Sequence, residues 1–185
     1  MKRRFDAEFE TFVRAHRVAL VRFATVLATG DGFLAEDLVQ GALVRVYLAK
    51  PSGTADLLAY VRRAVLNGLI DHKRRSFIRR ESVMSSVPDH AVRAVEDGFD
   101  PDLVAALGTL PPRMRAAVVL RHVEGLSIEE TADALGCSAG TVKSQTNRGL
   151  GKMRRVITDG GSHPGRPTKP SAALSDLGAY ACLIS

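Results

Sequence analysis

The sequence predicts an all-α protein made of two small helical domains joined by a flexible linker. Three observations predict it. Apolar residues recur at helical spacing through residues 5–75 and again through 102–157, as in helices that bury one face. No segment alternates apolar and polar residues in the way a half-buried strand does. Between the two stretches, residues 77–101 lose the period and collect Ser, Gly, Pro and acidic side chains, which indicates a linker.

The first domain is predicted to hold three helices. The first helix runs from about Phe5 to a break at 30–32, and its apolar residues fall on one face. The second covers about 34–49, and the third begins near Ala55 and runs into a basic cluster at 73–75. Three helices of this length form a small domain.

The second domain is predicted to hold four helices, at about 102–109, 112–123, 127–136 and 139–157. The last two join at Gly136, because glycine permits the left-handed backbone of a tight turn. Ala132 lets these helices pack closely, and Ser138 can cap the last one. This pattern predicts a helix-turn-helix. The boundaries we predict are 1–76 for the first domain, 77–101 for the acidic linker, 102–157 for the second domain and 158–185 for a disordered tail.

Composition limits the classes of function. The chain has 185 residues, and 45% of them are hydrophobic, as in ordinary folded proteins. Its net charge of +6 and pI of about 9.7 favour an anionic partner such as nucleic acid or a membrane surface. Cys137 and Cys182 form no CxxC pair, so we expect no metal and no cofactor. The sequence carries no signal peptide and no membrane-spanning run, so we expect a cytoplasmic protein without membrane insertion.

The last predicted helix carries candidate DNA-binding residues. Val142, Thr146, Leu150, Met153 and Ile157 form its inward stripe. Outside that stripe lie Ser144, Gln145, Arg148, Lys152 and Arg155. A helix with hydroxyl, amide and guanidinium groups facing outward near its start is equipped to read base edges in a major groove. A helical hairpin with a solvated basic face remains the alternative.

Two further clusters lie in the first domain. Five basic residues accompany an amide, a carboxylate and an aromatic ring, which suits single-stranded nucleic acid; they are Arg62, Arg63, Lys73, Arg74 and Arg75, beside Asn67, Asp71 and Tyr60. An amphipathic core helix with a basic end is the alternative. In the second cluster, Glu36 and Asp37 fall in the first turn of the predicted helix 34–49, where the helix dipole favours acids. Ordinary capping explains that cluster by itself.

Three segments in this order carry a resemblance to a known family. They are DGFLAEDLVQGALVRVY at 31–47, AYVRRAVLNGLIDHKRR at 59–75 and LPPRMRAAVVLRHVEGLSIEETADALGCSAGTVKSQTNRGLGKMR at 110–154. Together they resemble bacterial RNA polymerase sigma factors of the extracytoplasmic-function (ECF) type, over about residues 5–157. The resemblance implies sigma domain two and sigma domain four, a linker between them, and a factor that directs promoter-specific initiation without being an enzyme.

The resemblance also implies a role for three sets of residues. The set that would bind the β′ clamp coiled coil of core RNA polymerase is Glu36, Asp37 and Gln40. The set that would bind the −10 promoter element is Tyr60, Arg62, Arg63, Asn67, Asp71, Lys73, Arg74 and Arg75. The set that would bind the −35 element is Ser138, Thr141, Lys143, Ser144, Gln145, Arg148 and Lys152. Residues near 51–55 would shape a pocket for a flipped −10 base.

Further partners follow from the same resemblance. The helices before the helix-turn-helix would hold the β flap, and the acidic linker would pass through a basic channel of the polymerase. An anti-sigma factor is a further partner of such proteins. The chain departs from the family pattern at Gly41, where Glu is usual, and Tyr47 and Tyr60 stand where Trp is frequent.

Two alternative functions remain at this point. A helix-turn-helix regulator that acts without polymerase would use only the C-terminal motif, and the AEDLVQ segment argues against it. A recombinase or transposase would need a nucleophile or a set of metal-binding carboxylates in its other domain. The first 75 residues offer Glu36, Asp37 and Asp71 without a convincing third ligand.

Overall fold

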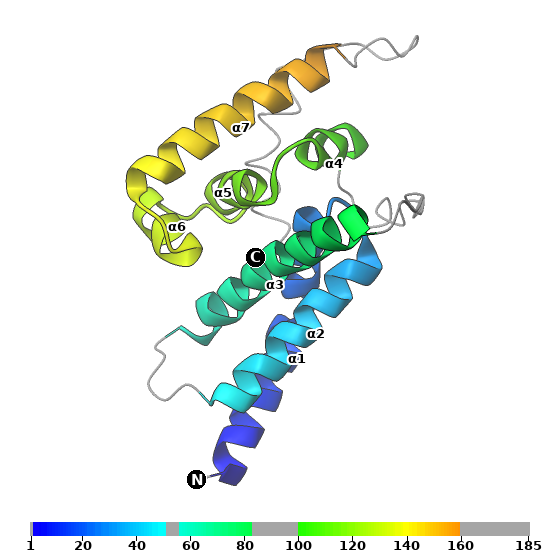
Figure 1. Ribbon diagram of the computed structural model, residues 1–185. Coiled ribbons are helices and arrows are strands. Elements are labelled where there is room, and N and C mark those ends of the chain that lie inside the picture. Colours follow the sequence, from blue (N-terminus) through cyan, green and yellow to red (C-terminus); the bar gives the residue numbers. More distant parts are fainter. Residues whose placement is uncertain (1, 51–55, 83–99, 160–185) are drawn as a thin grey trace.

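The computed structural model describes residues 2–50, 56–82 and 100–159, and every regular element in these ranges is an α-helix (Figure 1). The predicted all-α class is confirmed. The helices form an N-terminal unit of α1, α2 and α3 and a C-terminal unit of α4, α5, α6 and α7 (Figure 1).

The N-terminal unit packs α1 (Lys2–Leu27), α2 (Gly32–Ala49) and α3 (Leu57–Ser82) around an apolar core. The turn between α1 and α2 uses left-handed backbone at Gly30, where φ is 86°, a conformation that glycine adopts without steric cost. Asp31 then caps α2, because its side chain accepts a hydrogen bond from the Leu34 backbone N–H at 2.9 Å.

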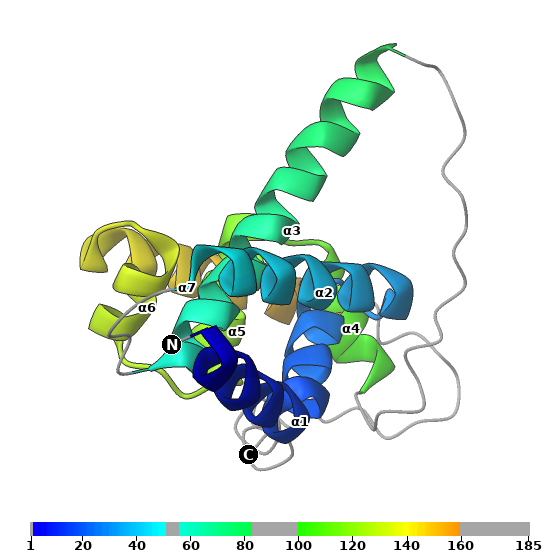
Figure 2. The same ribbon diagram turned by 90° about the horizontal axis from the view of Figure 1, so that it is seen from below.

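Two predicted boundaries in this unit are corrected. Since Asp31 is the cap, α2 begins at Gly32 and not near residue 34. Glu36 and Asp37 therefore lie in the second turn of α2, and capping does not account for them. The second correction is that α3 continues to Ser82, so residues 77–82 of the predicted linker are helical, and the end of α3 extends beyond the neighbouring helices (Figure 2).

The remaining linker residues 83–99, the loop 51–55 and the tail 160–185 lie outside the described residues. The predictions made for these segments stay predictions.

The C-terminal unit consists of α4 (Pro101–Gly108), α5 (Pro112–His122), α6 (Ile128–Leu135) and α7 (Ala139–Asp159). The bounds of its helices follow the predicted ones to within two residues. Gly136 ends α6 with φ of 61°, as the predicted tight turn requires. α7 packs on α4, α5 and α6, so the long last helix is supported by the three helices before it.

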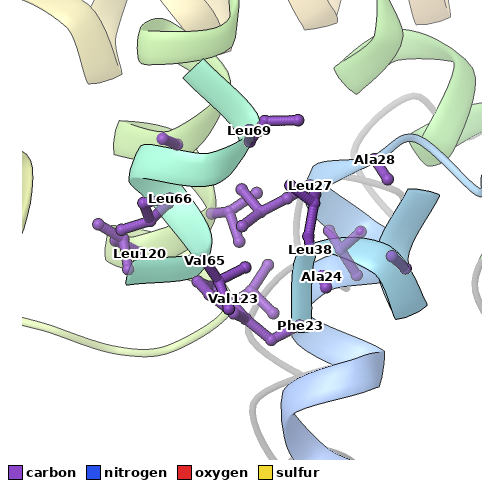
Figure 3. Close-up of a cluster of buried hydrophobic side chains, with 14 of the residues drawn as sticks. Phe23, Ala24, Leu27, Ala28, Leu38, Val65, Leu66, Leu69, Leu120 and Val123 are labelled. Atoms are coloured by element: carbon purple, nitrogen blue, oxygen red, sulfur yellow. The ribbon is translucent and has the colours of Figure 1, made fainter. Parts of the chain in front are cut away.

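The two units are packed together. α5 lies against α1 and α3, and α6 lies against α3. Figure 3 shows Leu120 and Val123 of the C-terminal unit beside Val65, Leu66 and Phe23 of the N-terminal unit. These five side chains are each at most 2% exposed and belong to one continuous hydrophobic core.

Candidate nucleic-acid interface

α7 has one apolar face and one polar face. Val142, Thr146 and Met153 are buried, and Leu150 and Ile157 are partly buried against the core, so the predicted inward stripe is confirmed. The seven residues predicted for duplex DNA all lie outside this stripe. Thr141 and Gln145 are half-buried, and the exposed ones are Ser138, Lys143, Ser144, Arg148 and Lys152.

Local capping fixes where α6 and α7 begin. Ser138 Oγ accepts the Thr141 backbone N–H at 3.2 Å, so Ser138 caps α7 as predicted. At the start of α6, the Ser127 backbone N–H donates to Glu130 Oε2 at 2.7 Å, and the Glu130 N–H donates to Ser127 Oγ at 3.0 Å. This is a capping box. The Ser127 backbone bond, followed by the side-chain bond, holds the pKa of Glu130 below its usual value.

A close approach of backbone to side chain positions α7 on α5. A Cβ atom at Gly149 would lie 2.6 Å from Val118 Cγ2 and 3.2 Å from Met114 Cγ. The first distance is shorter than any ordinary carbon–carbon contact, so the packing requires glycine. Gly151, two residues further along the same helix, has nothing within 4 Å of such an atom. Gly149 therefore allows α7 to pack closely on α5, and this close packing fixes the position of the polar face of α7.

The second predicted cluster is divided by the structure. Five residues on α3 recur at helical spacing, share one face and are exposed; they are Tyr60, Arg63, Asn67, Asp71 and Arg74. Lys73 is also exposed but lies on another side of the helix. Of the other two basic residues of the predicted −10 set, Arg62 leaves this face, whereas Arg75 is exposed one turn after Asp71, at the edge of the face toward α2.

Arg62 turns toward the C-terminal unit. Its Nη2 pairs with Glu124 Oε2, and its guanidinium lies 5.9 Å from the centroid of the Phe23 ring. The Glu124 side chain is 2% exposed and the Arg62 side chain 22%. Burial raises the pKa of Glu124, and the charge of Arg62 opposes this only in part. Glu124 Oε1 has no hydrogen-bond partner among the described residues, so this carboxylate is incompletely satisfied.

Arg75 lines a groove between α2 and α3 with a volume of about 550 Å³. Arg45 Nε donates to the Gly41 carbonyl at 3.0 Å, and a Cβ atom at Gly68 would lie 2.9 Å from Arg45 Nη2. The Arg45 side chain therefore lies over two glycines. The lining residues are Asp37, Leu38, Gly41, Arg45, Gly68, His72 and Arg75.

Arg115 on α5 is a buried residue that sequence reasoning missed. Its side chain donates to four carbonyls: Leu107 at 3.0 Å, Gly108 at 3.4 Å, Leu110 at 3.1 Å and Leu27 at 2.7 Å. These carbonyls lie at and just beyond the C-terminal ends of α4 and α1, where helix dipoles favour a cation. Burial lowers the pKa of Arg115 to about 10, so it stays charged near neutral pH. Arg115 thus ties the two units together.

The exposed face of α2 holds the third predicted set. Asp37 and Gln40 are exposed, and Glu36 is half-buried, with its Oε2 2.8 Å from Arg17 Nη2. Phe33 and Leu48 lie on the same face as Asp37 and Gln40, at helical spacing, and are 75% and 72% exposed. Sequence reasoning missed these apolar side chains, although their spacing from Asp37 could have revealed them.

The fold and these faces define a helix-turn-helix protein with a basic recognition face and a second, all-helical unit. No helix within the described ranges is both long and apolar enough to cross a bilayer. Two family matches cover the same two units: "Sigma-70 region 2" matches residues 12–76, and "Sigma-70, region 4" matches residues 102–153.

Relatives agree with these matches. The chain is 41% identical over 161 residues to the RNA polymerase sigma-E factor of Streptomyces avermitilis, covering 81% of this chain and 85% of that protein. It is 34% identical over 163 residues to the ECF RNA polymerase sigma factor SigE of Mycolicibacterium smegmatis, covering 80% and 61%. A solved structure, the sigma factor RpoE of Bartonella quintana in complex with the anti-sigma factor NepR, superposes with a TM-score of 0.65 at 25% identity, covering 82% of this chain and 97% of that chain.

The chain therefore belongs to the sigma-70 family of RNA polymerase sigma factors, in the ECF group. It directs promoter-specific initiation of transcription together with RNA polymerase, and the reading as a stand-alone regulator is not favoured.

Proposed function

We propose that three exposed faces divide the work of this sigma factor. The face of α2 with Asp37 and Gln40, together with Glu36, binds the β′ clamp coiled coil of core polymerase. The face of α3 from Tyr60 to Arg74 engages the −10 element, and the polar face of α7 reads the −35 element. The domain limits 1–76 and 102–157, the acidic linker and the tail stand with this proposal as predictions.

The chemistry of each face supports its assigned partner. The α2 face combines exposed Phe33 and Leu48 with acidic and amide groups, which suits a protein surface better than a phosphate backbone. The α3 face offers an aromatic ring, an amide and guanidinium groups, the set that stacks and holds single-stranded bases. The exposed Arg148 and half-buried Gln145 on the first turns of α7 suit base edges in a major groove.

In this proposal the chain acts together with core polymerase and other partners. The protein itself is not an enzyme, because the polymerase carries out nucleotide addition, and it acts in the cytoplasm, where polymerase and chromosome meet. The helices α4 and α5 hold the β flap. An anti-sigma factor is a further partner, as it is for the RpoE protein of the Bartonella structure.

One observation carries the proposal: Asp37 is exposed beside exposed apolar side chains of α2, and it lies beyond the first turn, where it does not cap the helix. Asp37→Arg should weaken binding of the full chain to purified core polymerase by about tenfold, equivalent to about 1.4 kcal/mol. Glu10→Arg on α1 makes the same charge change at another exposed site and should leave the affinity unchanged.

Binding is measured by titration of labelled chain, and function by run-off transcription on a promoter library. If Asp37→Arg and Glu10→Arg changed the affinity for core polymerase equally, the proposal that α2 lies in the polymerase interface would be wrong. Absence of promoter-specific run-off with wild-type chain would overturn the initiation role itself.

A further inference from the structure

The groove between α2 and α3 has the size and the lining of a small-molecule site. Its volume of about 550 Å³ lies within the roughly 300–1,000 Å³ that is typical of ligand pockets. Two stripes of residues line it, each on one face of its helix because its members recur at spacings of three or four residues. They are Asp37, Gly41 and Arg45 on α2, and Gly68, His72 and Arg75 on α3.

Arg45 reaches across the groove because a glycine lies in each wall. Its Nε donates to the Gly41 carbonyl at 3.0 Å, which holds the guanidinium over α2. A Cβ atom at Gly68 would lie 2.9 Å from Arg45 Nη2, so the same guanidinium also lies close to the backbone of α3. A Cβ atom at Gly41 would meet only Arg45 Nη2, at 3.8 Å. The two glycines therefore leave room beside an exposed guanidinium.

The groove carries more basic than acidic groups. Arg45, His72 and Arg75 are exposed, and neither arginine forms an ion pair within the described ranges. Guanidinium groups present N–H donors in a fixed fork that matches phosphate oxygens, and an imidazole N–H donates as well. Asp37 is the one acid among the described residues that line the groove. A carboxylate repels phosphate, but it accepts hydrogen bonds from sugar hydroxyl groups, as the acidic residue of dinucleotide-binding folds does from ribose.

We propose that this groove binds a small phosphorylated ligand of the sugar-phosphate or nucleotide class. Arg45, His72 and Arg75 hold its phosphate group, and Asp37 accepts its hydroxyl groups. Because Asp37 also belongs to the face proposed to bind the β′ clamp, the ligand and core polymerase compete for the free factor. The competition rests on the proposed function, whereas binding of the ligand to the free chain does not.

Binding is tested by isothermal titration calorimetry of the full chain with AMP, inorganic phosphate and adenosine. AMP should bind, phosphate of similar charge should bind more weakly because it lacks the sugar, and adenosine should not bind at the same concentrations. Absence of AMP binding at millimolar concentration, or equal binding of adenosine, would overturn the proposal. Equal binding of phosphate and AMP would exclude the sugar-phosphate class.

Substitutions at Gly41 show whether the ligand lies in the groove. Gly41→Glu places a carboxylate four residues before Arg45, at the spacing of a helical ion pair, and should weaken AMP binding by about tenfold or more. Gly41→Ala adds a Cβ atom in ordinary contact with Arg45 and should leave the affinity unchanged. Both changes replace a glycine inside a helix, so neither should unfold the chain. Equal affinities of the two variants for AMP would exclude the groove as the site.

Two adjacent arginines of α3 separate the groove from the proposed −10 surface. Arg75 lines the groove, whereas Arg74 lies on the exposed face with Asn67 and Asp71. Arg75→Gln should weaken AMP binding by about tenfold, because a charged donor to phosphate is lost, and Arg74→Gln should leave it unchanged. If the two variants lost equal affinity, the phosphate would belong to the nucleic-acid surface and the groove proposal would be wrong.

Competition is tested by the affinity of the full chain for core polymerase in the presence of AMP. At ten times its dissociation constant, AMP should raise the apparent dissociation constant for polymerase about elevenfold. The Gly41→Glu variant should show no such rise, which separates this effect from AMP that binds the polymerase itself. An equal rise for the variant, or no rise for the wild-type chain, would refute the competition. The titrations of free chain need no polymerase, so failure of the site is distinguishable from failure of the initiation role.

Discussion

α3 and α7 carry similar sets of basic and amide side chains, and the structure treats them differently. α7 keeps its predicted polar face exposed, because only its apolar face meets α4, α5 and α6. α3 is enclosed by α2 on one side and by the C-terminal unit on another, so Arg62 is taken up by Glu124. Side-chain type thus indicates what a helix can bind, whereas its neighbours decide which of those groups are available.

The largest expected effect comes from removing Arg115 on α5, which joins the C-terminal unit that supports α7 to the N-terminal unit that contains α3. Arg115→Met should lower the free energy of unfolding by about 3 kcal/mol or more, because four carbonyls lose a charged donor. Arg113→Met, on the exposed side of the same helix, should cost less than about 0.5 kcal/mol. Urea unfolding followed by circular dichroism measures both. Similar losses in the two variants would mean that the α5 contact with α1 is not stabilising.

Glycine substitutions compare the packing of α7 with that of α3. Gly149→Ala should destabilise by about 1–3 kcal/mol, because the added methyl group meets the short, stiff Val118 side chain. Gly68→Ala on α3 meets the movable end of Arg45 as well as Leu38, so its cost should be smaller. Gly151→Ala meets nothing and should stabilise by about 0.5–1 kcal/mol.

Thermal unfolding of the three alanine variants measures which of the two helices, α7 or α3, is more tightly packed at its glycine. If Gly68→Ala proved the more damaging, α3 would be the more tightly packed of the two and the comparison would be reversed.

Base recognition by α7 is expected to separate two kinds of side chain. Arg148→Ala or Gln145→Ala should relax preference at one or two −35 positions by about 1–3 kcal/mol each. Lys152→Ala should weaken all sequences alike and lower the salt slope by about one unit. Neither should alter −10 preference, which we assign to α3. Binding and transcription on promoters randomised at one element at a time measure this, and a shifted −10 preference for Arg148→Ala would contradict the assignment.

The smallest expected effect is a pH dependence of the free energy of unfolding that comes from His122, at the end of α5, the helix on which α7 packs. Burial, with a smaller contribution from Arg121, lowers the pKa of His122. The folded state therefore disfavours a proton that the unfolded state accepts near pH 6.5. The stability that His122 contributes is present above about pH 6.5 and is lost as the pH falls through its lowered folded pKa. His122→Gln should flatten this part of the profile in thermal unfolding between pH 8 and 5, and an unchanged profile would contradict this role of His122.

Several features of α2 and α3 show where sequence reasoning stopped. The sequence shows Glu36 and Asp37 near the start of a helix, but the turn in which they lie depends on which residue caps that helix. Because Asp31 is the cap, α2 begins at Gly32 and both residues fall in its second turn. The end of α3 at Ser82 runs past the point where the composition changes, because a helix continues as long as its backbone hydrogen bonds form and needs no apolar stripe at each turn.

The sequence by itself determined the helical class, the turn at Gly136, the cap at Ser138 and the outward face of α7. Each depends on residues a few positions apart, so the signal is local. The tertiary structure alone decided that Arg115 binds four carbonyls and that Arg62 pairs with Glu124 while the adjacent Arg63 stays exposed. The Leu27 carbonyl and Glu124 lie far along the chain from Arg115 and Arg62, and one residue's difference in helical phase turns a side chain by about 100°. Periodicity places a residue on a face, and only packing shows what that face meets.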